Sequence, residues 1–226
     1  LDFSCVRPNS DEEGAGVEAE ASEFDLQGAR HPLLELRLRA QQGVIVPLNI
    51  ALPADMKQMI ISGPNTGGKT VALKTAGLLA LMGQAGIPVP ATSARLPLFS
   101  AVYADIGDAQ SIEQNLSTFS AHVARLREMA LDVTPDSLVL LDEIGSATDP
   151  DEGGALGVAL VEHFRASGAF TLASTHLTAL KVYGASTKTV LNASMGFDEE
   201  TLAPTYRLQL GLPGKSAGLD IAARLG

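Results

Sequence analysis

The stretch Gly63-Pro64-Asn65-Thr66-Gly67-Gly68-Lys69-Thr70 fits the pattern Gly-x-x-x-x-Gly-Lys-[Ser/Thr]. Its flanks suit that pattern, because residues 56–62 predict a short apolar strand and residues 70–82 have the composition of a helix. Glycines let backbone N–H groups turn inward around phosphate oxygens, and the helix N-terminus adds partial positive charge. The sequence therefore predicts a site for a nucleoside triphosphate and Mg²⁺. Lys69 would reach the β- and γ-phosphates, and the Thr70 hydroxyl would hold the metal.

A pair of acidic residues follows the apolar run at residues 138–141. This run predicts a buried parallel strand, which would deliver Asp142 and Glu143 to the carboxyl edge of the sheet, where ligands bind in open α/β folds. Asp142 would complete the Mg²⁺ shell, and Glu143 would orient and polarise the attacking water. The alternative is an acidic pair that ends a strand on the surface.

Two further positions have both a functional and a structural interpretation. His176 follows the apolar run at residues 170–174, and an imidazole at a strand end can touch a γ-phosphate or a water. Ser117 opens a predicted helix, whose free N–H groups form either an anion site or a simply capped terminus. Taken alone, His176 is more often structural, as are His31 and His122, and His163 is expected on the surface.

The composition limits the partners of the chain. Its 226 residues carry a formal net charge of −10, and residues 1–25 hold eight acidic side chains against Arg7 alone. Binding of DNA or RNA would therefore need basic surface from other parts of the protein. A single cysteine fits a reducing cytosol, so we expect a cytoplasmic protein. No apolar run is long enough to span a membrane, and we expect the chain to be a fragment of a larger protein.

The order of the expected elements indicates an α/β fold. Residues 1–27 predict an acidic, flexible leader, with a mobile linker at residues 8–23. Strands are expected at residues 33–38, 44–46, 56–62, 101–105, 138–141 and 170–174, helices at residues 70–82, 117–131 and 153–167, an irregular connection at residues 87–97, and an antiparallel pair at residues 190–197 and 206–210. Because strands and helices alternate, the sheet should be mainly parallel with helices on both faces.

Four ordered motifs resemble the ATPase domain of the MutS family. They are the glycine-rich loop, Asp-Ile-Gly-Asp-Ala-Gln-Ser-Ile-Glu-Gln-Asn-Leu-Ser-Thr-Phe-Ser at residues 105–120, Leu-Leu-Asp-Glu-Ile-Gly-Ser-Ala-Thr-Asp-Pro at residues 140–150, and Ala-Ser-Thr-His at residues 173–176. Residues 29–34 resemble the segment that opens that domain, so the resemblance covers residues 28–226. The combination of Thr66 and Thr70, with the run at residues 110–119, is closer to the second bacterial paralogue of the family.

This resemblance implies an ABC-type P-loop NTPase that binds ATP and Mg²⁺ and works as a head-to-tail homodimer. Ser117 would touch the γ-phosphate bound by the other subunit, and residues 145–150 would lie at the dimer seam. Gln110 would occupy the Q-loop position, and His176 would be the switch histidine. Ile45 and Val46 lie where the family packs against adenine. Lys69, Glu143, His176 and Ser117 are thereby the expected catalytic residues.

The paralogue branch is associated with suppression of homologous recombination, branched-DNA binding, a nuclease-type Smr domain and rescue of stalled ribosomes. We therefore expect an ATPase whose nucleic-acid-gripping parts lie outside this chain. A nucleotide-gated switch with little turnover is the alternative. The motor of a membrane transporter is disfavoured, because Leu-Ser-Thr-Phe at residues 116–119 replaces the Leu-Ser-Gly-Gly-Gln signature of that class. Whether the full protein acts on branched DNA, mismatches or ribosomes stays open at this level.

Overall fold

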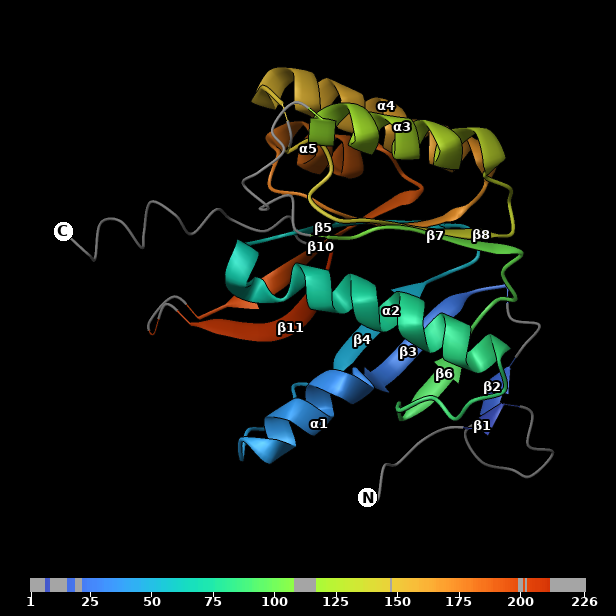
Figure 1. The fold of residues 1–226 in the computed structure, drawn as a ribbon, viewed down its shortest axis with the longest axis vertical. Helices are drawn as coiled ribbons and strands as arrows, with labels where there is room; N and C mark the ends of the chain where they lie inside the picture. The colour runs from blue at the N-terminus through green and yellow to red at the C-terminus, as the bar shows by residue number, and fades with distance from the viewer. Residues whose placement is uncertain are drawn as a thin grey trace.

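The computed structural model of the chain describes residues 7–8, 16–18, 22–107, 117–146, 148–198, 201 and 203–211. Six strands form its main sheet: β5 (Gln58–Ser62), β7 (Ala101–Asp105), β8 (Ser137–Leu141), β9 (Phe170–Ser174), β10 (Val190–Phe197) and β11 (Pro204–Leu210). Their order is β11-β10-β5-β9-β8-β7, and Figure 1 shows the sheet edge-on between the helices. All neighbours are parallel except the antiparallel pair β10 and β11. The expected α/β fold with a mainly parallel sheet is therefore confirmed.

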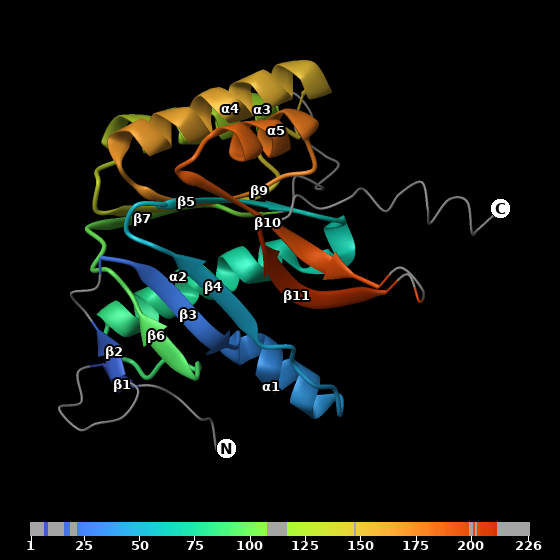
Figure 2. The same ribbon diagram turned by 180° about the vertical axis from the view of Figure 1, so that it is seen from behind.

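Helices cover both faces of this sheet. Three of them lie on one face: α3 (Ser117–Asp132), α4 (Pro150–Ser167) and α5 (Thr178–Ser186). Helix α2 (Lys69–Gln84) lies on the other face, as Figures 1 and 2 show from opposite sides. Within the described residues, no helix is both long enough and apolar enough to cross a membrane.

The central strands supply two hydrophobic cores. Every residue of β5, β8 and β9 is buried, as expected for strands that are covered on both faces. Because successive side chains of a strand point to opposite faces, Leu138 and Leu140 pack toward α2, while Val139 and Leu141 pack toward α3 and α4. Helix α2 lies very close to the sheet, since a Cβ on Gly77 would be 2.5 Å from Leu140 Cδ1. This close packing holds the start of α2 at the edge of the sheet.

A second sheet, which we did not expect, lies beside α2, on the same side of the main sheet (Figures 1 and 2). It contains β1 (Arg7–Pro8), β2 (Gly16–Glu18), β3 (Phe24–Ala29), β4 (Leu48–Leu52) and β6 (Ser93–Arg95), in the order β1-β2-β6-β3-β4. Phe24 and Leu26 are fully buried in the core that α2 shares with both sheets. The expected flexible leader is thus wrong for residues 24–27, and residues 17–18 of the expected linker pair with β6.

The strand expected at residues 33–38 is also wrong, because helix α1 (Pro32–Ala40) occupies this segment. His31 caps the helix by accepting a hydrogen bond from the Leu34 backbone N–H, and Pro32 stands at its first position, where no backbone donor is needed. Leu34 and Leu38 are four residues apart, so they fall on one helical face. The spacing of the leucines fits both a strand and a helix, and the His31 cap together with Pro32 favours the helix.

Three smaller expectations also need correction. Residues 44–46 have no regular structure, and the strand begins only after Pro47, at β4. Residues 87–97 are not wholly irregular, since they contain β6. Helix α4 begins at Pro150, one turn earlier than expected, because the Asp149 carboxylate accepts hydrogen bonds from two backbone N–H groups there. Helix α5 was missed altogether.

Candidate nucleotide-binding site

Three adjacent strands of the main sheet bring the predicted residues to one edge. The glycine-rich loop (residues 63–70) follows β5, the pair Asp142-Glu143 follows β8, and His176 follows β9. Because β9 lies between β5 and β8 and all three are parallel, their carboxyl ends meet. Segments that are 33 to 113 residues apart in the sequence thus form one site.

The glycine-rich loop has the backbone shape of an anion cradle. Residues Asn65–Gly67 form a 3-10 turn, and α2 begins directly after Gly68. Gly63 and Gly68 have φ values of 127° and 96°, in the left-handed region that favours glycine. The space is also tight, because a Cβ on Gly68 would lie 3.3 Å from the Tyr206 ring. The pattern Gly-x-x-x-x-Gly-Lys-Thr therefore meets a real steric need at both glycines.

The Lys69 side chain folds back over this loop. Its Nζ donates a hydrogen bond to the Gly63 carbonyl at 2.9 Å and lies 3.5 Å from Glu143 Oε1. The residue is 1 % exposed, and this burial lowers the pKa of its ammonium, while the carboxylates of Glu143 and Asp142 act in the opposite direction. A buried ammonium needs a negative partner, and a phosphate group at the loop could take the place of the Glu143 carboxylate.

Asp142 connects the loop to the strand ends. Its Oδ2 accepts a hydrogen bond from Thr70 Oγ1 at 2.7 Å, and its Oδ1 accepts one from Ser174 Oγ at 2.6 Å. The Asp142 backbone N–H donates to the Asp105 carbonyl at 2.9 Å, which fixes the peptide to β7. The Thr70 hydroxyl and the Asp142 carboxylate are hard oxygen ligands that lie side by side, and this donor set fits Mg²⁺, which takes one or two carboxylates together with phosphate oxygens.

Glu143 occupies a strained position between two cationic or potentially cationic groups. Its φ of 52° is unusual for a residue with a side chain, and such backbone costs about 1–3 kcal/mol and persists where the surroundings impose it. Its backbone N–H donates to Ser174 Oγ at 2.9 Å. Its carboxylate contacts Lys69 on one side and, through Oε2, His176 Nδ1 at 3.3 Å on the other. The turn after β8 thus places the Glu143 carboxylate between Lys69 of the glycine-rich loop and His176.

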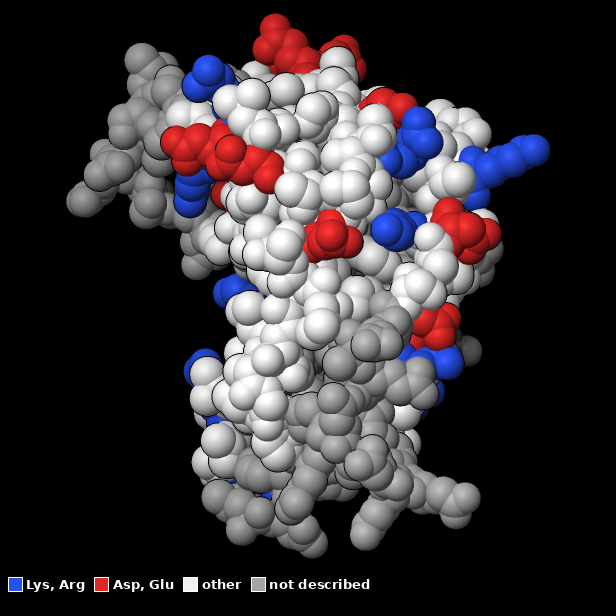
Figure 3. Space-filling view, turned by 90° about the vertical axis from the view of Figure 1, so that its right-hand side faces the viewer, with Lys and Arg blue, Asp and Glu red and all other residues white. Residues whose placement is uncertain are grey.

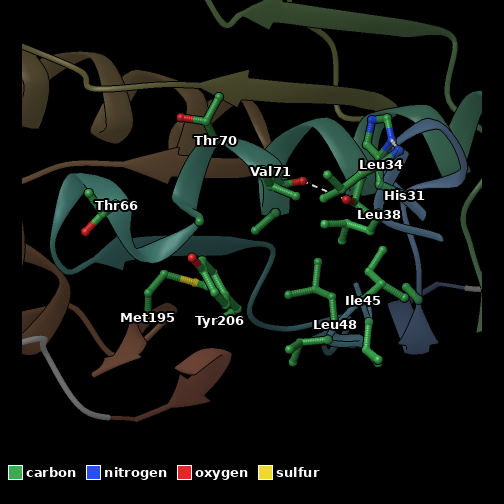
Figure 4. A pocket seen from close by; sticks show the side chains of 16 residues that line it. His31, Leu34, Leu38, Ile45, Leu48, Thr66, Thr70, Val71, Met195 and Tyr206 are labelled. Atoms are coloured by element: carbon green, nitrogen blue, oxygen red, sulfur yellow. Dashed lines mark hydrogen bonds between the residues drawn. The ribbon is translucent and has the colours of Figure 1, made fainter. Parts of the chain in front are cut away.

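An apolar pocket opens beside the loop and includes the two residues expected to contact a base, Ile45 and Val46. Figure 4 shows Ile45 and Leu48 on one side, with Tyr206 and Met195 on another. Leu34 and Leu38 of α1 and Thr66, Gly68 and Thr70 also line it. The pocket has a volume of about 410 Å³, within the range of small-ligand sites. Apolar walls that lead directly to a phosphate-binding type of loop suit a flat heterocycle with a charged tail.

Comparison with known proteins gives a consistent result. A family model described as MutS domain V matches residues 59–226. The chain belongs to the MutS family. The proteins named Endonuclease MutS2 from Pelotomaculum thermopropionicum and Halothermothrix orenii are 53 % identical over 211 residues and 49 % identical over 230 residues. These alignments cover 93 % and 100 % of this chain but 26 % and 28 % of the relatives. The chain thus resembles the MutS2 type and spans about a quarter of the length of these relatives.

Some residues that we expected in the site of this MutS-family chain lie outside the described part. Gln110 is among them, as are the side chains of Asn65 and Ser117; the backbone of Ser117 begins α3 as predicted. Their roles stay predictions. The described members of the expected set, in contrast, converge: Lys69, Thr70, Asp142, Glu143 and His176 form one chain of contacts.

The structure adds residues that sequence reasoning missed. Ser174 binds both members of the acidic pair, and its place in Ala-Ser-Thr-His, two residues before His176, was a usable signal. Tyr206 left no such signal, because a lone aromatic residue in a β-strand is ordinary. It has a φ of 56° and is 48 % exposed at the mouth of the pocket. Met195 faces the glycines, within 3.3 Å of where a Cβ on Gly63 would lie.

The other histidines have structural partners. His31 caps α1, and burial together with the nearby Lys74 lowers the pKa of its imidazole. His163 is exposed, as expected, and its Nε2 also lies 2.8 Å from the Ala130 carbonyl, so this side chain of α4 donates a hydrogen bond to α3. His122 lies 3.0 Å from the Asp105 carboxylate.

Proposed function

We propose that this chain is the ATP-binding and ATP-hydrolysing domain of a MutS-like protein, with an ABC-type P-loop fold. The observation that carries the proposal is the continuous set of contacts from Thr70 through Asp142 and Ser174 to Glu143, and from Glu143 to Lys69 and His176. These contacts place a buried cation, a hydroxyl–carboxylate pair and a second carboxylate at one helix N-terminus. Phosphoryl transfer to water needs this combination.

Each side chain has a role that follows from its position. Lys69 would exchange its contacts with Gly63 and Glu143 for the β- and γ-phosphate oxygens. Thr70 and Asp142 would hold Mg²⁺, which when bound neutralises developing charge on the phosphates. Glu143, released from Lys69, would orient the attacking water and accept its proton. His176 holds the Glu143 carboxylate from the other side and keeps it directed toward the nucleotide.

The apolar pocket would take the adenine ring. Ile45 and Val46 form part of its wall, and Tyr206 presents an aromatic ring beside Gly68, at the point where the base and the phosphates must be linked. A base between an aliphatic wall and an aromatic ring is removed from water on both faces. The preference for adenine over guanine rests on the resemblance to the family.

We further propose that two copies share the active sites. Ser117 starts α3 and would bind the γ-phosphate of the other copy, Gln110 would occupy the Q-loop position, and residues 145–150 would lie at the seam. The domain would comprise residues 28–226, with strand β3 joined to it because Phe24 and Leu26 belong to its core. ATP would hold two copies together, and hydrolysis would release them.

The action of the whole protein is a separate proposal. The relatives are named endonucleases, so we propose a cytoplasmic protein that acts on DNA through regions beyond this chain, in suppression of recombination through branched-DNA binding. In the view of Figure 3, acidic and basic side chains are interspersed over the upper half. The formal net charge of −10 supports the assignment of DNA contacts to other regions. Service in ribosome rescue, with nucleotide as a switch, is the alternative.

The decisive experiment measures ATP hydrolysis per molecule over a wide range of protein concentration, for the wild type and for Ser117→Ala. Specific activity that rises with concentration and collapses in Ser117→Ala is the expected result, with Ser186→Ala as a control at an exposed position in the last turn of α5. A flat specific activity that is insensitive to Ser117 would contradict the shared site. Binding of ATP without turnover at any concentration would favour the switch.

A second experiment addresses Glu143 directly. Glu143→Gln keeps the size of the side chain but removes the proton acceptor, so ATP should still bind while turnover falls by at least about 100-fold. The ATP-bound dimer should then accumulate, as size-exclusion chromatography with light scattering would show. Glu128→Gln makes the same chemical change on the exposed face of α3 and should leave turnover unchanged. Normal turnover in Glu143→Gln would exclude Glu143 as the base.

A further inference from the structure

Among the described side chains, those that attach helix α3 to the rest of the molecule lie mainly in its C-terminal half. Leu126 and Met129 are 3 % and 8 % exposed and pack into the core under α4. The carbonyls of Ala130 and Asp132 accept hydrogen bonds from His163 Nε2 and from the Tyr103 hydroxyl. All of these contacts lie at least nine residues beyond Ser117, or about 13 Å along the helix axis at 1.5 Å per residue. Contacts this far along the helix do not by themselves fix the position of its first turn.

The Asp105 carboxylate supplies the contact nearest to that start among the described side chains. Asp105 is the last residue of β7 and is 8 % exposed. Its Oδ2 lies 3.0 Å from His122 Nδ1, and its Oδ1 lies 3.8 Å from Arg125 Nη2. His122 is five residues from Ser117, or about 7.5 Å along the axis. The imidazole and the carboxylate thus form a close polar contact, which becomes an ion pair when His122 is protonated.

The same residue also holds the acidic pair through its backbone. The Asp105 carbonyl accepts the hydrogen bond from the Asp142 N–H at 2.9 Å, directly before Glu143. One residue therefore touches α3 through its side chain and the strand end that carries Asp142 through its main chain. A buried carboxylate is expensive unless it is paired, so the low exposure of Asp105 indicates that the pairing with His122 is maintained.

We propose that Asp105 and His122 are positioning residues for ATP hydrolysis, forming a clamp that sets the start of α3 relative to the acidic pair. This inference rests on the proposed function, because it concerns Ser117 and the γ-phosphate site of a shared dimer. The clamp touches neither the glycine-rich loop nor the base pocket. Its loss should therefore lower the catalytic rate and leave nucleotide affinity in place.

The test compares Asp105→Asn with Glu128→Gln in the complete protein. Both variants replace a carboxylate by an amide, but Glu128 is exposed on the same helix and serves as the matched control. We measure kcat, the Kd for a fluorescent ATP analogue, and hydrogen–deuterium exchange of the α3 backbone amides. In Asp105→Asn we expect kcat to fall about tenfold and the amides around His122 to exchange about tenfold faster, with Kd changed less than about twofold. Glu128→Gln should match the wild type in all three.

Two substitutions at His122 test whether a polar group at the position of Nδ1 is needed. They also provide a second test if Asp105→Asn does not fold. His122→Leu removes the donor and should reproduce the loss, whereas His122→Asn places an amide near the position of Nδ1 and should recover most of it. Unchanged kcat and unchanged exchange in Asp105→Asn and His122→Leu would overturn the clamp, as would a loss of kcat with no change in α3 exchange. If the wild type itself does not hydrolyse ATP, faster exchange confined to α3 still supports a clamp that sets the start of α3, while the role of that clamp in hydrolysis fails together with the proposed function.

Discussion

Replacing Ser174 by alanine is the sharpest test of how the site is held together. Ser174 is fully buried at the end of β9, and its hydroxyl donates to Asp142 Oδ1 at 2.6 Å while it accepts from the Glu143 N–H at 2.9 Å. In Ser174→Ala both partners lose this contact. Because the position is 0 % exposed, bulk water does not reach the vacated site directly. The substitution therefore leaves a carboxylate oxygen and a backbone donor undersatisfied at the turn that aims Glu143.

The size of the effect follows from the two hydrogen bonds. A hydrogen bond to a charged group contributes about 1.5–3 kcal/mol, and one between neutral groups contributes about 1 kcal/mol. We therefore expect the free energy of unfolding to fall by about 3 kcal/mol. For a domain of this size, that loss lowers the melting temperature by about 6–12 °C. Turnover should fall as well, because the Asp142 and Glu143 side chains lose a common support.

Thr171 provides a matched control on the same strand. It is 1 % exposed, and its hydroxyl has no hydrogen-bond partner among the described residues. Thr171→Val also removes a buried hydroxyl from β9 but breaks no hydrogen bond, so stability should stay level or rise by about 1 kcal/mol. Urea denaturation followed by circular dichroism, with ATPase assays at matched temperature, measures both variants. A stability loss in Ser174→Ala no larger than in Thr171→Val would refute this account of the site.

Two further predictions concern the stability of α4 and its contacts. Hydrogen bonds from Arg165 and Tyr183 lower the pKa of Glu162 to about 2, so its contribution to stability is present above pH 4.5 and is lost as the pH falls toward 2; the gap in urea midpoint between the wild type and Glu162→Gln should therefore narrow between pH 5 and 3. Gly153→Ala should destabilise the domain by about 3 kcal/mol, since its Cβ would lie 2.0 Å from the Gly145 carbonyl oxygen. In Gly154→Ala the new Cβ meets only the Ala179 methyl group at 3.0 Å, so the free energy of unfolding should fall much less in the same denaturation assay. Equal decreases in the two variants would argue against the clash at Gly153.

Much of the main sheet could be predicted from local patterns. The strands at β7, β9 and β10 were expected at the bounds that the structure shows. For β9, a buried apolar run between polar breaks has few alternatives. The prediction of a strand at residues 33–38 was wrong, because the leucines of α1 fit both the two-residue period of a strand and the four-residue spacing of a helix. The His31 cap, which favours the helix, is recognised only when the hydrogen bond to Leu34 is seen. The second sheet could not be foreseen, because β2 and β6 have three residues each and are defined only by their pairing.

The sequence by itself determined the chemistry of the candidate site: a glycine-rich loop, a carboxylate pair after an apolar strand, and a histidine after the next strand, in an order typical of the MutS family. Each of these signals lies within a short stretch of the chain, so it can be recognised in the sequence alone. The tertiary structure alone decided which side chains share a contact. Ser174 and Asp142 are 32 residues apart, Thr70 and Asp142 are 72 apart, and Tyr206 meets Gly68 across more than half of the chain. Such contacts depend on the order of the strands in the sheet and on the face of the sheet that α2 covers. This arrangement is favoured because it buries both hydrophobic cores together, and no single segment of the sequence can bury either core alone.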